Sequence, residues 1–220
     1  MIFKIEKKTY SGAPVNFGEV LRYAGAKAAD DNLKTLITGC LYECEKEKAI
    51  NYAVCFTETP LSVNGETTDF FAFALKSKNL ATAMRGAESA LIFACTVGMG
   101  IDRLIKKYSE INPAKALVFQ ALGAERVETF TDVFLADYEK TRGVKLSPRF
   151  SAGYGDLPLN AQKDIFRLLD PRKHLGLTLN DSLLMSPSKS VTAFAGINGT
   201  CLHGGLSCKD CDKENCGYRR

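Results

Sequence analysis

Ten consecutive residues combine a guanidinium, several small residues and an aromatic ring, and they run RFSAGYGDLP over positions 149–158. The planar guanidinium of Arg149 matches a carboxylate through two parallel hydrogen bonds. The glycines in this segment let backbone amides and carbonyls approach a ligand edge without a Cβ in the way. Such a loop suits a polar small molecule, although the same composition is also typical of a surface turn whose arginine is salt-bridged.

Four cysteines close to the C-terminus form the second group with evident chemistry: Cys201, Cys208, Cys211 and Cys216. Four thiolates at such short spacing can surround one tetrahedral zinc ion or an iron-sulfur cluster. A zinc ion there would have a structural role, whereas an iron-sulfur cluster would suit the delivery of electrons. The other interpretation is a solvated terminal segment with reduced thiols and no metal.

The remaining four of the eight cysteines lie in apolar surroundings: Cys40, Cys44, Cys55 and Cys95. Because the chain shows no secretory signal, we expect reduced thiols rather than a disulfide framework. Cys40 and Cys44 fall on the apolar stripe of a predicted helix, so we interpret both as packing residues.

The spacing of two further motifs is typical of enzymes, but each motif is incomplete. Ser186 and Lys189 have the Ser-x-x-Lys spacing of acyl-transferring hydrolases, yet the partner Lys-Thr-Gly motif is missing and Pro187 stands where a helix start is required. Gly98 and Gly100 are half of a phosphate loop at best, and a tight turn from a strand into a helix explains both. Neither motif predicts a function.

The composition is that of an ordinary globular protein, since 45% of the 220 residues are hydrophobic and 25% are charged. The net charge of +4 is mild and the basic residues are scattered among acids, which excludes the concentrated basic stripe of a nucleic-acid-binding surface. No signal-peptide pattern is present, and the apolar run over 89–101 is shorter than the about 20 residues of a membrane span. We therefore expect a cytoplasmic protein with neither a nucleic-acid nor a membrane partner.

The pattern of apolar residues predicts helices and strands in groups, which indicates an α+β fold. Helical spacing covers 16–29, 33–44, 80–89, 101–108, 114–139 and 160–169. Runs of β-branched and aromatic residues predict strands over 50–57, 67–75, 90–97, 176–185 and 190–197. The composition changes only after position 198, so we expect one domain over 1–198 and a Cys-rich tail over 199–220.

The order of these motifs is similar to that of a known family. The segment RFSAGYG resembles the Arg-x-x-x-Gly-Tyr motif of the activation domain of cobalamin-dependent methionine synthase, the element that binds S-adenosylmethionine there. The segments QKDIFRLL, GLTLNDSLLM and SPSKSV then follow in the family's order, and CTVG upstream looks like the short stand-alone members. The resemblance covers about residues 17–198. It implies a twisted, mainly antiparallel sheet with packed helices.

The resemblance also implies roles for individual residues. By motif position, Arg149 is the partner of the methionine carboxylate, while Ala152, Gly153 and Tyr154 shape the adenosine pocket. Glu128 stands in a Val-Glu-Thr-Phe frame similar to that of the family's ligand-binding acid, where a carboxylate can meet the ammonium or sulfonium charge. The alternative for this residue is a solvated helical charge. The family's early acidic ligand contact has no counterpart that we can match here.

A stand-alone member of this family would act in trans, as a component of methionine synthase, a methyltransferase. It would hold S-adenosylmethionine for the reductive methylation of oxidised cobalamin, with electrons from a donor such as flavodoxin or ferredoxin. The partner, a methionine synthase lacking its own activation domain, would bring the cobalamin, because neither histidine lies in the Asp-x-His-x-x-Gly pattern of corrinoid domains. The alternative is a non-catalytic iron-sulfur or zinc protein for electron transfer or docking with another corrinoid enzyme.

Overall fold

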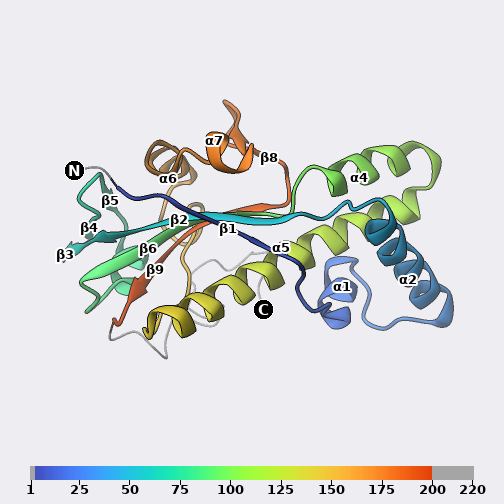
Figure 1. Ribbon diagram of the computed structural model, residues 1–220, viewed down its shortest axis with the longest axis horizontal. Helices are drawn as coiled ribbons and strands as arrows, with labels where there is room; N and C mark the ends of the chain where they lie inside the picture. The colour runs from blue at the N-terminus through green and yellow to red at the C-terminus, as the bar shows by residue number, and fades with distance from the viewer. Residues whose placement is uncertain (1–2, 200–220) are drawn as a thin grey trace.

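The computed structural model describes residues 3–199 of the chain. A four-stranded antiparallel sheet forms its centre, with the strands in the order β1, β2, β6 and β9 (Figure 1). Their bounds are β1 Glu6–Tyr10, β2 Tyr52–Pro60, β6 Ser89–Thr96 and β9 Ser190–Ile197. The two central strands, β2 and β6, are almost wholly buried, as a continuous apolar run predicts for a strand covered on both faces.

Helices pack on both faces of this sheet (Figure 1). Their bounds are α1 Phe17–Tyr23, α2 Asp31–Lys46, α3 Lys78–Ala83, α4 Gly100–Ile111, α5 Pro113–Arg142, α6 Gln162–Leu169 and α7 Pro171–Leu175. Helix α5 lies along one face, where α1, α2 and α4 pack against it, and α6 lies on the other. This combination confirms the predicted α+β fold with a mainly antiparallel sheet.

Alternate residues of the central strands face two separate hydrophobic cores. On β6, Leu91 and Phe93 belong to the core beneath α5, whereas Ala90 and Ile92 belong to the core beneath α6. Successive side chains of a strand point to opposite faces of the sheet, so the same strand supplies both cores. The sheet therefore separates the two cores and contributes side chains to both. A segment that pairs with the edge of the sheet is held by packing on both sides.

Helix α5 begins and ends close to its predicted limits. The side chain of Asn112 caps its N-terminus by accepting the amide of Lys115 at 3.1 Å, and Pro113 occupies the first turn. Gly143 ends the helix with φ of 66°, a left-handed conformation that favours glycine. Although α5 has 30 residues, neither it nor another helix within residues 3–199 is long and apolar enough to cross a membrane.

Two predicted helices end early and one helix was not predicted. Helix α1 ends two residues before Gly25 instead of continuing to position 29, and α3 ends three residues before Gly86 instead of reaching position 89. Both glycines have φ of 74°, a left-handed conformation that closes a helix. Helix α7 is a single short turn that starts at Pro171, directly after Asp170 has reversed the chain with φ of 43°.

Two predicted strands are broken into short pieces. The short strands are β3 Ser62–Asn64, β4 Thr67–Asp69, β5 Ala74–Lys76, β7 Thr178–Leu179 and β8 Met185–Ser186. The continuous strand predicted over 67–75 is wrong because Phe71 adopts φ of 67° and turns the chain between β4 and β5. The strand predicted over 176–185 is wrong for a similar reason, since Leu183 has φ of 62°.

The turn from β6 into α4 confirms the structural interpretation of its two glycines. Gly98 has φ of 83°, and a Cβ at Gly100 would lie 2.3 Å from the carbonyl oxygen of Ala49. No larger residue fits at position 100 without moving the backbone. The left-handed conformation therefore explains Gly98, and close packing explains Gly100.

The four described cysteines are free thiols inside the protein: Cys40, Cys44, Cys55 and Cys95. Burial raises the pKa of Cys40 to about 11 and that of Cys44 to about 12. Both remain protonated at neutral pH and lie in the core beneath α5. The packing role predicted for these two residues is confirmed.

Candidate functional site

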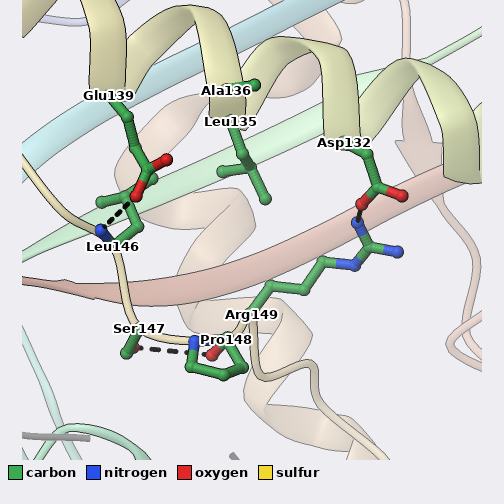
Figure 2. A pocket seen from close by; sticks show the side chains of 8 residues that line it. All are labelled: Asp132, Leu135, Ala136, Glu139, Leu146, Ser147, Pro148 and Arg149. Carbon is green, nitrogen blue, oxygen red and sulfur yellow. Dashed lines mark hydrogen bonds and ion pairs between the residues drawn. The ribbon is translucent and has the colours of Figure 1, made fainter. Parts of the chain in front are cut away.

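Arg149 lies at the edge of the central sheet, in the segment that leads from α5 toward α6. Residues before and after it pair with β9: Ser147 donates its amide to the carbonyl of Gly196 at 2.8 Å, and Phe150 exchanges two backbone hydrogen bonds with Phe194 at 2.8 and 2.9 Å. These bonds fix the backbone on both sides of Arg149. Its side chain extends from this fixed edge toward α5 (Figure 2).

Two carboxylates of α5 hold the guanidinium of Arg149. Nη2 donates to Glu128 Oε2 and Nη1 donates to Asp132 Oδ1, and Figure 2 shows the second contact. The two acids are one helical turn apart and therefore face the same side of α5. The Arg149 and Glu128 side chains are 21% and 27% exposed, whereas that of Asp132 is 70% exposed. Burial lowers the pKa of Arg149, but the two carboxylates outweigh it and raise the pKa overall, so the guanidinium stays charged.

An open cavity of about 410 Å³ adjoins this cluster (Figure 2). It is lined by Asp132, Leu135, Ala136, Glu139, Leu146, Ser147, Pro148 and Arg149. The lining thus combines an apolar wall from α5 with a guanidinium and two carboxylates. One of the acids, Glu139, also accepts the backbone amide of Leu146 at 2.8 Å, which ties the two sides of the cavity together.

The loop after Arg149 places its residues in two different environments. Ala152 is only 7% exposed and packs in the core beneath α6, so only its backbone could reach a ligand. Gly153 has φ of 87°, and its amide donates to the carbonyl of Leu157 at 2.9 Å, which closes a tight turn. Tyr154 is 62% exposed, and its ring lies 6.5 Å from that of Phe150.

Asp156 anchors this loop to the start of α3. Its carboxylate accepts a hydrogen bond from the Ser77 hydroxyl at 2.5 Å and from the amides of Lys78 and Asn79 at 2.7 and 3.2 Å. Burial alone would raise the pKa of Asp156, but these donors lower it below its usual value. The carboxylate therefore acts as a helix cap supplied from a distant segment, and it fixes the loop that carries Tyr154.

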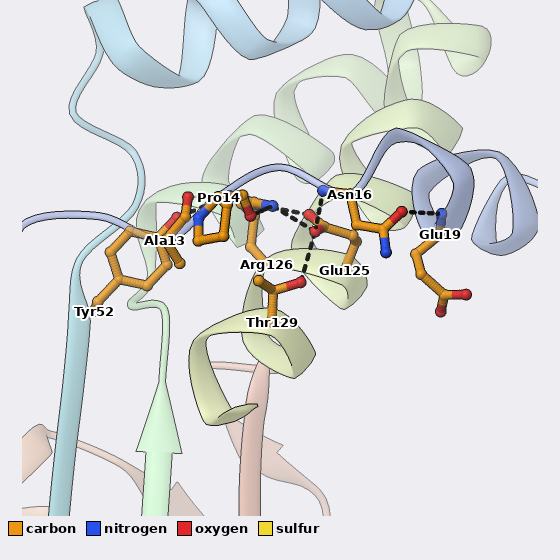
Figure 3. Close-up of polar contacts among 8 residues, drawn as sticks. All are labelled: Ala13, Pro14, Asn16, Glu19, Tyr52, Glu125, Arg126 and Thr129. Atoms are coloured by element: carbon orange, nitrogen blue, oxygen red, sulfur yellow. Dashed lines mark hydrogen bonds and ion pairs between the residues drawn. The ribbon is translucent and has the colours of Figure 1, made fainter. Parts of the chain in front are cut away.

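A buried ion pair on α5 anchors the N-terminal segment of the chain (Figure 3). Glu125 and Arg126 are 0% and 2% exposed and pair with each other. The guanidinium donates to the carbonyls of Ala13 and Pro14 at 2.9 and 2.6 Å, and Glu125 accepts the amide of Asn16 at 2.9 Å. Every charge has a partner, so the pair works as a structural clamp that joins the segment before α1 to α5.

Comparison with known proteins identifies the architecture. No sequence-family model matches the chain, and no curated protein matches it. A solved structure of the MetH reactivation domain bound to AdoHcy has a similar fold over 94% of this chain and 82% of that chain, with a TM-score of 0.72 and 14% sequence identity. The chain has the fold of the MetH reactivation domain. An identity this low establishes a shared architecture alone.

Within this reactivation-domain fold, the structure brings together two of the predicted site residues. Glu128 and Arg149 are in direct contact, and Gly153 and Tyr154 lie on the loop that follows. Asp132 was missed in the sequence, although its position one helical turn after Glu128 was visible there. The roles of these residues toward a ligand stay predictions.

The predicted metal ligands lie outside the described residues: Cys201, Cys208, Cys211 and Cys216. Within residues 3–199, no group of three or more His, Cys, Asp or Glu side chains is arranged to hold a metal ion. A zinc ion or an iron-sulfur cluster in the tail therefore stays a prediction.

Proposed function

We propose that the chain binds S-adenosylmethionine beside Arg149 and supports the reductive methylation of oxidised cobalamin on a partner methionine synthase. The observation that carries this proposal is the guanidinium at the rim of an open cavity of about 410 Å³, on a backbone fixed by β9. The fold is shared with a domain whose structure holds AdoHcy, the demethylated form of this ligand.

The side chains of Arg149, its two acidic partners and the loop that follows complement the groups of the ligand. S-adenosylmethionine carries a carboxylate, an ammonium, a sulfonium and an adenine ring. Arg149 would receive the carboxylate, while Glu128 and Asp132 would offset the two positive charges. The largely exposed ring of Tyr154, on the loop anchored by Asp156, would stack on the adenine.

The contribution of the chain to the reaction would be positioning. Transfer of the methyl group from sulfur to the partner's reduced corrinoid would leave the electron pair of the broken bond on sulfur, and the product would be S-adenosylhomocysteine. No proton has to move, so the site needs no general base. Holding the methyl donor in one assembly with the corrinoid replaces a bimolecular encounter by a step within the complex. This proximity is the main way in which such a module can accelerate the reaction.

The proposal includes partners that supply what the chain lacks. The partner is a cytoplasmic methionine synthase without its own activation domain, which brings the cobalamin, and the electron comes from a donor such as flavodoxin or ferredoxin. The cavity and the acidic groups beside Arg149 are what this chain contributes to that assembly.

Two measurements test the proposal. Isothermal titration of the full chain with S-adenosylmethionine should show binding, and an oxidised methionine synthase lacking its activation domain should regain turnover when given the chain, reductant and S-adenosylmethionine. A non-catalytic protein that serves another corrinoid enzyme in electron transfer or docking would neither bind S-adenosylmethionine nor restore turnover. Absence of ligand binding would refute the proposal, and co-purification of stoichiometric corrinoid with the chain would show that the cobalamin does not come in trans.

A further inference from the structure

Lys189, the lysine of the incomplete Ser-x-x-Lys motif, directly precedes β9 and lies against α5. A Cβ added to Gly123 of α5 would lie 2.8 Å from Cγ and 3.0 Å from Cε of Lys189, and 3.1 Å from Cγ1 of Ile101 in the first turn of α4. The backbone is fixed as well, since the carbonyl of Lys189 accepts the amide of Val97 at 3.1 Å. The aliphatic part of this lysine is therefore packed between two helices, in a space that the missing side chain of Gly123 leaves open.

The amine of Lys189 has a neutral hydrogen-bond partner. Nζ donates to Oε1 of Gln120 on α5 at 2.5 Å. Asp102 of α4 uses its carboxylate instead to accept the amide of Ser188, at 2.8 Å, and the hydroxyl of the same residue. No ion pair within residues 3–199 includes Lys189, whereas several other lysines pair with acids: Lys8, Lys34, Lys107, Lys115 and Lys145. A neutral amide stabilises the charged ammonium less than a carboxylate does.

These surroundings favour the neutral amine. Partial burial lowers the pKa of Lys189 below its usual value, and the negative charge of Asp102 opposes the shift only in part. Only the neutral amine carries the lone pair that attacks a carbonyl carbon, so a lysine in apolar surroundings is a stronger nucleophile at neutral pH than an exposed one. The hydrogen bond of Nζ goes to Gln120, so the lysine is positioned to react itself rather than to activate Ser186.

We propose that Lys189 is a modification site at which the ε-amine condenses with an aldehyde to form an imine. The lone pair of Nζ forms the new bond to the carbonyl carbon, both protons of the neutral amine pass to the carbonyl oxygen, and that oxygen leaves as water. A carbon–nitrogen double bond replaces the carbon–oxygen double bond, so the step needs neither an oxidant nor a reductant. The site is independent of the proposed binding of S-adenosylmethionine, because it uses neither Arg149 nor the residues that line the cavity.

The test treats the full chain with acetaldehyde and sodium cyanoborohydride at pH 7, which converts each imine into a stable secondary amine, and peptide mass spectrometry measures the rate at every lysine. Lys145 is the internal reference, because its side chain is 72% exposed and its ammonium lies 4.0 Å from Glu139. Accessibility alone would make Lys145 react faster. We expect Lys189 instead to react at least about threefold faster, and the ratio to fall as the pH rises toward about 10, where exposed lysines also supply neutral amine.

A charge variant and a matched control identify the cause of the reactivity. Gln120→Glu places a carboxylate beside Nζ and stabilises the ammonium, so the rate at Lys189 should fall about threefold or more while the rate at Lys145 stays unchanged. Asn64→Asp adds the same charge at the exposed end of β3, beyond the end of the central sheet opposite to Lys189 (Figure 1). It should change neither rate. Thermal unfolding of both variants checks that the fold is kept.

Three results would overturn the proposal. If Lys189 reacts no faster than Lys145 in the parent protein, burial protects the amine instead of activating it. If Gln120→Glu leaves the rate at Lys189 unchanged, or Asn64→Asp lowers it equally, the neutral partner is not the cause. Lys189→Arg keeps the positive charge and should remove only the fast phase of the modification, so a fast phase that persists in this variant would belong to another lysine.

Discussion

Glu128 and Arg149 lie 21 positions apart in the sequence and meet side chain to side chain between α5 and the edge of the central sheet. Both side chains are more than two-thirds enclosed, so solvent screens this ion pair less than an ordinary surface pair. The backbone of Arg149 is also fixed by the bonds of its neighbours to β9. The guanidinium is thus held in place by the protein itself.

Arg149→Ala should weaken the binding of S-adenosylmethionine by about 2 kcal/mol or more, which is on the order of thirtyfold. The change removes the charge-assisted hydrogen bonds to the ligand carboxylate and leaves that carboxylate facing two acids. Isothermal titration measures the effect. Arg167→Ala is the matched control, because Arg167 is 77% exposed and pairs with Asp164 on α6, away from the cavity. Equal affinities of Arg149→Ala and the parent protein would exclude Arg149 from the site.

The sequence predicted the residues whose role depends on local order and missed those whose partners are distant. Arg149 and Glu128 were predicted as ligand contacts because each stands in a short motif that resembles one of a known family, and the structure places their side chains in contact. Asp156 was visible in the same loop, but its anchoring role was not, since its partner Ser77 lies 79 positions away. Asp132 was missed because an acid on an exposed helical face is indistinguishable in the sequence from a solvated charge.

The fold was predictable where burial imposes a regular pattern. Strands β6 and β9 are continuous apolar runs because both of their faces are covered, and α5 carries its cap and its terminal glycine in the sequence. The broken strands were not predictable, because Phe71 and Leu183 adopt positive φ values that their side chains do not favour. Local hydrogen bonds accompany both turns: the Phe71 amide donates to Asp69 Oδ1 at 2.7 Å, and the Leu183 amide donates to the carbonyl of Asn180 at 2.9 Å.

Arg126→Ala should lower the free energy of unfolding by roughly 3–5 kcal/mol, because it leaves the fully buried carboxylate of Glu125 without a counterion. Urea denaturation measures the change. Arg142→Ala, which removes a 42% exposed guanidinium from surface pairs with Glu6 and Glu58, should cost less than about 1 kcal/mol. Similar losses in the two variants would show that the clamp at Glu125 and Arg126 is no stronger than a surface ion pair.

Asp156→Asn should destabilise the protein by about 1 kcal/mol at neutral pH, since a charged cap of α3 becomes a neutral one. The folded state lowers the pKa of Asp156, so its contribution to stability is fully present above the pKa of the unfolded chain, about 4. It is lost as the pH falls through the lower, folded-state pKa. Urea denaturation of both proteins from pH 7 down to pH 3 should therefore show the difference shrinking below about pH 4. If the difference in stability between the two proteins stayed constant over this pH range, the ionised carboxylate of Asp156 would not be the source of the stabilisation.

The double variant Cys208→Ser and Cys211→Ser should lose a bound metal and keep the ligand site. These two residues form the two-residue chelating element of the predicted tail site, so a zinc ion or a cluster could not be held without them. Within the part of the chain that the structure describes, the cavity beside Arg149 is lined by residues between positions 132 and 149, and so we expect the affinity for S-adenosylmethionine to change by less than about threefold, or under ~1 kcal/mol.

The measurement is metal analysis and an absorption spectrum after anaerobic purification, followed by titration with S-adenosylmethionine. Ser207→Ala is the control, because it changes the same segment and keeps all four thiols. Zinc in the parent protein would identify a structural staple, whereas a broad visible band would identify a cluster suited to electron delivery. A metal-free parent protein would show that the prediction for the tail is wrong. Loss of ligand binding in the double variant, with binding kept in Ser207→Ala, would instead show that the tail contributes to the pocket.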